Sequence, residues 1–444
     1  MLKLALPIII ANLLQTAYNL TDTFWVGRLG KTAVAAVSLS FPVLFFMISL
    51  GSGLATAGSI LVAQYKGKKD QKAVDFFTSQ TFLMVFFVSV VISVLGYFLS
   101  PVFIRLMNPE ADVAGAAISY LKISFIGTVF LFGFFVFQGL MRAIGKPKLP
   151  MFIVLGTVLL NLVLDPFFIF GYSFMPSLGV SGAALATIFT QLIATVTGLF
   201  ILFSGKKGIK IHLTDLRPDF KIIKKMFRLG FPSSLERSSR SLGMLMLTFL
   251  VSGFGTTAIA AYGIGIRILS FIIVPAMGIS MATSVLVGQS LGSENSGKAR
   301  EIAKKGSLFG FLVLSASGIV IFFFARPISS FFIPGQAEVI NSSAFFIKLI
   351  SFSFGFLALQ FILSGILRAA GNTIAPMLLS FVLLFVLRFP IALVLSRYTS
   401  LVEKGIWWSF PISNIIGAAI TIAYFSRSSW HKRRLTKQIK PEAL

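Results

Sequence analysis

Two pairs of polar residues attract attention because they lie inside segments that are otherwise apolar. Tyr18 and Asp22 are four residues apart in the stretch YNLTD, and Asn161 and Asp165 are four residues apart in NLVLD. Residues at this spacing share one face of a helix. A charged side chain at the centre of a hydrocarbon layer costs about 2.5–3.5 kcal/mol on insertion scales. The protein must therefore either compensate for these two carboxylates or use them.

Further polar side chains extend the same pattern. Gln15 and Asn19 fall on the helical face that carries Asp22, and Thr187 and Gln191 form another pair four residues apart. Polar stripes of this kind indicate a surface that faces other protein or a water-filled cleft rather than lipid. The candidate substrate-cleft residues are Gln15, Asn19, Gln191, Glu236 and Arg240.

The depth of these residues in their segments indicates what they could do together. With a helical rise of about 1.5 Å per residue, Asp22, Asp165 and Thr187 all lie in one layer of the N-terminal helix bundle. This layer is in the half of the membrane that faces the outside. Two carboxylates in one buried pocket can share a proton, because burial and mutual repulsion both disfavour the doubly ionised pair. Their oxygens, with those of an amide and hydroxyls, also suit Na⁺. The alternatives are a self-satisfied polar cluster and an Asp22 that is merely interfacial.

The C-terminal half has the opposite character, with basic residues inside its apolar segments. Glu236 and Arg240 are four residues apart in the first turns of a helix and are expected to form a structural ion pair. Arg267 and Arg388 have no obvious carboxylate partner. If they line a cleft, anionic or zwitterionic substrates become plausible.

The elements that must position these side chains are membrane-spanning helices. Of the 444 residues, 56% are hydrophobic and only 12% are charged, and the mean hydropathy is +0.91. This composition is far from that of a soluble globular protein. Segments of about 20 apolar residues, enough to cross the bilayer, recur twelve times, roughly at 4–27, 33–62, 75–99, 118–141, 149–172, 179–204, 229–252, 258–288, 306–326, 343–367, 374–396 and 405–425. The predicted fold class is all-α, with 12 transmembrane helices.

The net charge of +25 is explained by topology rather than by nucleic acid. With a cytoplasmic N-terminus, 27 of the 39 lysines and arginines fall in inner segments and 8 in outer ones. This is the positive-inside bias, and it predicts that both termini are cytoplasmic. The inner basic surface needs no partner beyond anionic lipid headgroups. No cysteine, P-loop or zinc motif is present, which argues against an enzyme and against any cofactor other than H⁺ or Na⁺.

An internal repeat divides the chain into halves. LALP, GKTAVAA and LVAQYKG recur 225 residues later as LGFP, GTTAIAA and LVGQSLG, and QGLMRAIGKPKLPM recurs 226 residues later as SGILRAAGNTIAPM. The prediction is an N-terminal six-helix lobe at 1–204, a basic cytoplasmic linker at 205–228 and a C-terminal lobe at 229–444. Parallel repeats are typical of secondary transporters. The positions equivalent to Asp22 and Asp165 are Leu247 and Ile391, so the acidic residues are not duplicated, which favours function over packing.

The motifs with Pro7, YNLTDTFWVG, LVAQYKG, QGLMRAIGKPK and NLVLDP resemble the multidrug and toxic compound extrusion (MATE) family, in particular the branch named for DNA-damage-inducible protein F. The resemblance implies two pseudo-symmetric six-helix lobes in a V and antiport of drugs or metabolites against H⁺ or Na⁺. By this resemblance, the ion-coupling residues are Tyr18, Asp22, Asn161, Asp165 and, as a fifth, Thr187. Pro7 matches a proline associated with bending of the first helix. An acidic position of other branches has no match in the C-terminal lobe, since Glu236 lies too near the start of its helix.

These observations predict a secondary active antiporter in the cytoplasmic membrane. It would export organic cationic or amphipathic compounds by alternating access in exchange for H⁺, which two adjacent carboxylates favour over Na⁺. The alternative is a flippase for lipids or lipid-linked precursors, and a channel or a sensor is disfavoured. The expected partners are small organic substrates and membrane lipids, and the expected state is a monomer.

Overall fold

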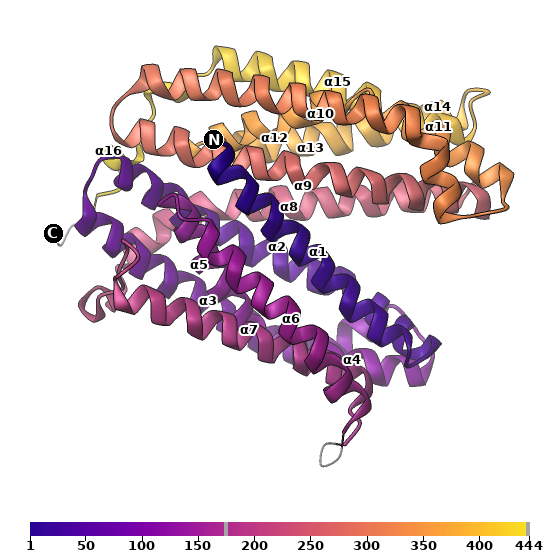
Figure 1. The fold of residues 1–444 in the computed structure, drawn as a ribbon, viewed down its shortest axis with the longest axis horizontal. Coiled ribbons are helices and arrows are strands. Elements are labelled where there is room, and N and C mark those ends of the chain that lie inside the picture. The colour runs from indigo at the N-terminus through magenta and orange to yellow at the C-terminus, as the bar shows by residue number, and fades with distance from the viewer. Residues whose placement is uncertain (173–175, 441–444) are drawn as a thin grey trace. The chain divides into compact units, whose positions relative to one another are not determined.

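The computed structural model describes residues 1–172 and 176–440, and within these ranges the protein is built from helices without a β-strand (Figure 1). The first seven helices are α1 (Leu2–Gly27), α2 (Lys31–Gly67), α3 (Gln71–Leu106), α4 (Ala111–Ile126), α5 (Thr128–Ala143), α6 (Lys148–Phe170) and α7 (Gly179–Ser204). A short helix, η1 (Leu213–Leu216), leads to α8 (Phe220–Ser252). The predicted all-α class is confirmed.

The remaining helices repeat the order of the first set. They are α9 (Thr256–Gly292), α10 (Ser296–Phe332), α11 (Ala337–Ser351), α12 (Phe354–Ala369), α13 (Ile374–Phe381), the π-helical η2 (Val382–Arg388), α14 (Phe389–Arg397), α15 (Glu403–Arg427), η3 (Trp430–Lys432) and α16 (Leu435–Gln438). Since α13, η2 and α14 follow one another directly, they form a single span over Ile374–Arg397.

Among the described residues, nine helices are long and apolar enough to cross a membrane. Two further spans are broken helices, α4 with α5, bent by 47°, and α11 with α12, bent by 51°. The twelfth predicted segment, 229–252, lies in α8, whose middle turns carry Glu236, Arg237 and Arg240 and are therefore less apolar. Because α8 begins at Phe220, Glu236 lies in the middle of its helix, and the expectation that it lies near the start was wrong. The protein is thus a multi-pass helical membrane protein.

The chain forms two compact units. The N-terminal unit comprises Leu6–Ser234 and the residues from Thr436 onward, and the C-terminal unit comprises Leu235–Leu435 and Met1–Ala5. The division falls inside α8, between Ser234 and Leu235. The α8 helix itself begins at Phe220, within the segment 205–228 that was predicted as a linker. The start of α8 has a local cause, because the Asp219 carboxylate accepts a hydrogen bond from the Ile222 amide at 3.0 Å, as an N-cap does.

The repeat is visible in the backbone of each unit. The α3 helix is capped by Asp70, which accepts from the Ala73 amide, and α10 is capped in the same way by Asn295, 225 residues later. The residues before these caps, Lys69 and Glu294, both have left-handed backbone angles, with φ of 63° and 62°. The α3 helix has 36 residues and α10 has 37, which accounts for the change of the repeat offset from 225 to 226.

Candidate functional site

The first part of the site in the N-terminal unit joins α1 to α7. The Thr187 hydroxyl donates to the Asp22 carboxylate at 3.2 Å. The Tyr18 hydroxyl lies 2.8 Å from that of Thr190. Because the Thr190 hydroxyl donates to the carbonyl of Thr187 at 2.8 Å, it is free only to accept, so Tyr18 is the donor. The predicted stripe of α1 is therefore hydrogen-bonded to one turn of α7.

The second part of the site lies on α6, which packs beside α7 (Figure 1). The Asn161 amide donates to the Asp165 carboxylate at 2.9 Å, and both residues are fully buried. This is the i, i+4 contact expected from the stretch NLVLD. The Asp165 carboxyl group also interacts electrostatically with that of Asp22, so the structure brings the two acids into one site.

Three buried oxygen atoms of this site have no hydrogen-bond partner among the described residues. They are Asp22 Oδ1, Asn161 Oδ1 and Asp165 Oδ2. A buried acceptor left without a donor is costly, and carboxylate, amide and hydroxyl oxygens are the ligands that hard cations prefer. The residues therefore fit the two ions predicted from the sequence. A proton would turn one carboxyl oxygen into a donor for the other acceptors, and Na⁺ would use all three oxygens as ligands.

Two members of the site were missed by the sequence reasoning. Thr190 lies three residues after Thr187, whereas the polar pattern was followed only at a spacing of four. Tyr120 comes from α4 and interacts electrostatically with both Asp22 and Asp165. The spacing of Thr190 offered a signal, since residues three apart also share a helix face. Tyr120 offered none, because no carboxylate or amide side chain lies near it in its predicted segment.

The predicted substrate-cleft residues of this unit do not join the acidic site. Gln15 and Asn19 on α1 are exposed and Gln191 on α7 is half-buried, and in the described part of the chain none of the three side chains makes a hydrogen bond. Pro7 lies in the second turn of α1, which runs without a break from Leu2 to Gly27. The roles predicted for these four residues remain predictions.

The C-terminal unit contains a buried ion-pair cluster. The predicted pair of Glu236 and Arg240 is confirmed at 3.2 Å, but the stronger partner is Arg368 on α12. One nitrogen of Arg368 donates to both Glu236 oxygens, at 2.8 and 2.6 Å. Arg240 also donates to the hydroxyl of Ser380 at 2.9 Å. Since Glu236 and Arg368 are 132 residues apart, no local pattern could have indicated their contact.

The two arginines predicted to lack a carboxylate partner differ in environment. Arg388 is buried and donates to Ser413 at 2.9 Å and to Asn414 at 2.5 Å. Arg267 is exposed, with its guanidinium group over the ring of Phe332 at 5.7 Å. Neither forms an ion pair within residues 1–172 and 176–440. Only Arg388 therefore lies in the interior of the unit.

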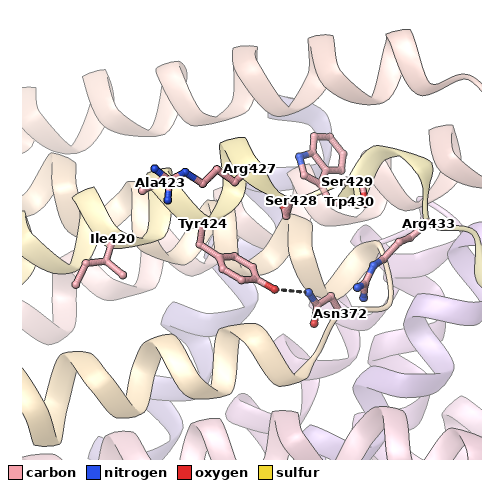
Figure 2. Close-up of a pocket in the computed structure, with 9 residues that line it drawn as sticks. All are labelled: Asn372, Ile420, Ala423, Tyr424, Arg427, Ser428, Ser429, Trp430 and Arg433. Atoms are coloured by element: carbon pink, nitrogen blue, oxygen red, sulfur yellow. Dashed lines mark hydrogen bonds between the residues drawn. The ribbon is translucent and has the colours of Figure 1, made fainter.

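A separate pocket of about 570 Å³ opens at the end of α15 (Figure 2). The Asn372 amide donates to the Tyr424 hydroxyl at 3.0 Å within it, as the dashed line in Figure 2 shows. Arg427 and Arg433 line the pocket together with Trp430, and in the described part of the chain neither arginine has an ion-pair partner. No residue predicted as a site lines this pocket.

Comparison with known proteins finds that the family model described as MatE matches residues 7–167 and 232–394. The probable multidrug resistance protein NorM of Thermotoga maritima is 29% identical over 98% of this chain and 93% of its own length. The probable multidrug resistance protein YoeA of Bacillus subtilis is 27% identical over 98% of this chain and 94% of its own. The crystal structure of MATE in complex with MaL6 superposes with a TM-score of 0.90 at 25% identity, covering 96% of this chain and 94% of that one.

Proposed function

Because this chain belongs to the MatE family, we propose that it is a secondary active antiporter that exports organic drugs or metabolites in exchange for H⁺ or Na⁺. The names of its relatives, multidrug resistance proteins, support the export of organic compounds. The single observation that supports ion coupling is the set of three buried oxygens on Asp22, Asn161 and Asp165 that lack a donor.

The coupling step follows from the charges of this site. With both carboxyl groups ionised, Asp22 and Asp165 repel each other in a medium of low dielectric constant. A single cation bound between them removes this repulsion and stabilises the packing of α1 against α6 and α7. Release of the cation restores the repulsion and loosens α1, which is anchored by the Tyr18–Thr190 and Asp22–Thr187 hydrogen bonds. We favour H⁺ as the coupling ion, because two adjacent carboxyl groups can share one proton.

The location and the lipid contacts of the protein belong to the same proposal. The distribution of lysine and arginine supports a multi-pass protein of the cytoplasmic membrane with both termini inside and with anionic lipid headgroups as partners. The pocket of Arg427 and Arg433 (Figure 2) is where such a headgroup would bind, because two guanidinium groups that have no ion-pair partner among the described residues suit a phosphate. We propose that the transporter acts as a monomer.

The experiment is efflux of a fluorescent organic cation from proteoliposomes, with a pH gradient and a Na⁺ gradient imposed separately. We expect efflux driven by the pH gradient alone, and loss of this efflux in Asp22→Asn and Asp165→Asn. The matched control is Asp112→Asn, which removes an exposed carboxylate at the start of α4 and should leave efflux unchanged.

Each outcome is informative. Efflux driven only by Na⁺ would make the same residues Na⁺ ligands. Normal coupled efflux in both variants would refute the assignment of the ion site. Absence of efflux under either gradient would contradict export of organic cations, and would direct attention to lipids and anionic compounds.

A further inference from the structure

The interior of the C-terminal unit contains more positive charge than it can neutralise. Four arginines, Arg237, Arg240, Arg368 and Arg388, lie in or beside the cluster on α8, α12 and η2, and Glu236 is the one carboxylate described among them. The Glu236 side chain is 5% exposed, and those of Arg240 and Arg368 are 27% and 21% exposed. The cluster therefore holds an excess of positive charge at the depth of the membrane spans.

Such an excess requires compensation. A buried charge is stable when an opposite charge or strong hydrogen bonds replace its hydration, and it is costly otherwise. The ion pairs of Glu236 account for Arg368 and Arg240. Arg388 is left with the neutral side chains of Ser413 and Asn414, and the groups that interact electrostatically with it are Tyr262 and a second cation, Arg240.

Arg388 also has donor capacity to spare. A guanidinium group carries five N–H donors, and Arg388 makes hydrogen bonds only through Nε and Nη2, so Nη1 has no acceptor in the described part of the chain. It lies at the end of η2, a π-helical segment, and such segments occur frequently at functional sites. Arg388 is thus held by Ser413 and Asn414 and keeps one nitrogen without an acceptor in the described part of the chain.

Two further buried donors lie in the same group of side chains. The Tyr262 hydroxyl is buried and interacts with the side chain of Thr248, and Trp407 Nε1 is buried without a hydrogen-bond partner in the described part of the chain. The Tyr262 ring lies 6.1 Å from that of Trp407 and 6.4 Å from that of Phe410, and the guanidinium carbon of Arg388 lies 4.7 Å above the same Phe410 ring. Phe410 therefore lies next to both the buried cation and the Tyr262 ring, which in turn stacks on Trp407. This arrangement offers donors and positive charge without a carboxylate acceptor.

We propose that the C-terminal unit binds the anionic group of an aromatic, amphipathic substrate at Arg388, with Tyr262 as a further hydrogen-bond donor and Arg240 as the neighbouring positive charge. The carboxylate or phosphate would accept from Nη1 of Arg388. This inference rests on the proposed function, because it names zwitterionic and anionic compounds as the preferred substrates of the exporter. The acidic site of the N-terminal unit remains the place of the coupling ion.

The test uses a matched pair of dyes, rhodamine B, which carries a carboxylate, and its ethyl ester, which does not. Equilibrium binding to the purified full-length protein in detergent is measured by fluorescence anisotropy without any ion gradient. The variants are Arg388→Gln, Arg388→Lys and Arg240→Gln, and the control is Arg267→Gln, which removes an exposed arginine of the same unit. A thermal unfolding scan of each variant ensures that only folded protein is compared.

We expect the wild type to bind rhodamine B more tightly than the ester. Arg388→Gln should weaken binding of rhodamine B by about tenfold or more, as loss of a charge-assisted hydrogen bond does, and should leave binding of the ester within about twofold. Arg388→Lys should restore part of the difference, Arg240→Gln should weaken rhodamine B alone, and Arg267→Gln should change neither dye. The preference for rhodamine B over its ester should thus depend on the positive charges of both Arg388 and Arg240, which do not share a hydrogen bond.

Three results would overturn the inference. They are equal loss of both dyes in Arg388→Gln, unchanged rhodamine B binding in both Arg388→Gln and Arg240→Gln, and a wild type that prefers the ester or binds neither dye. Because the measurement needs no gradient, failure of coupled transport would refute the proposed function and leave this binding result standing.

Discussion

The ion-pair cluster of Glu236 gives the sharpest prediction for stability. Replacing Glu236 with glutamine keeps the shape of the side chain and removes its charge. Glutamine has one acceptor oxygen where the carboxylate has two, so at least one of the three hydrogen bonds, at 2.6, 2.8 and 3.2 Å, is lost. The change also leaves Arg368 and Arg240 without a counterion in the described part of the chain. The C-terminal unit should therefore lose stability, and the N-terminal unit should not.

The size of the effect follows from burial. Removing one partner of a buried ion pair costs about 3–5 kcal/mol, because the other charge stays buried. The two arginines are partly exposed, at 27% and 21%, so water screens part of the charge that remains. The lower end, about 3 kcal/mol, is the appropriate magnitude, since screening reduces ion-pair energies towards those of surface pairs.

The assay is unfolding of the purified protein in detergent by a denaturant, followed by intrinsic fluorescence. The control is Glu301→Gln, which breaks the pair with Lys305 on α10 at a similar distance of 2.6 Å but in full exposure. We expect no measurable change in this control. The double variant Glu236→Gln/Arg368→Gln should be more stable than the sum of the single changes implies, because it removes a stranded charge. Equal stability of Glu236→Gln and the wild type would refute the reasoning.

Two further changes test the N-terminal unit. Gly182→Ala should destabilise the protein by about 1–3 kcal/mol, because a Cβ there collides with the backbone carbonyl of Phe168. Gly156→Ala, where the added Cβ meets no neighbouring atom within 4 Å, should stabilise it by up to about 1 kcal/mol. Denaturant unfolding measures both changes, and equal effects would contradict the packing of α6 on α7. Tyr18→Phe should lower the free energy of unfolding by about 0.5–1.5 kcal/mol, because the hydrogen bond to Thr190 is lost. It should slow coupled efflux in proteoliposomes without abolishing it. Complete loss of efflux would mean that Tyr18 takes a larger part in ion binding.

The sequence predicted the local contacts of the acidic site. Asn161 and Asp165 were expected on one helix face because they are four residues apart, and the structure joins them at 2.9 Å. Glu236 and Arg240 follow the same rule. Periodicity is informative here because a helix fixes which residues are neighbours regardless of the rest of the fold.

Contacts between distant helices could not be predicted in this way. Arg368 reads in the sequence as a basic residue after an apolar segment, yet it is the main partner of Glu236. Tyr120 and Asn414 likewise take their place from packing between helices, which no spacing along one helix encodes. The breaks of α4–α5 and α11–α12 were also missed, because no proline or charged residue marks either break and each pair was read as one straight span.

The repeated backbone has an evolutionary consequence. The two units share helix order, helix caps and even the left-handed residues Lys69 and Glu294, yet the positions equivalent to Asp22 and Asp165 are Leu247 and Ile391. Once a duplicated gene places two copies in one chain, selection acts on the interior of each copy separately. One copy could then become acidic and the other basic without any change in the scaffold. Opposite chemistries can in this way arise from a single ancestral helix bundle.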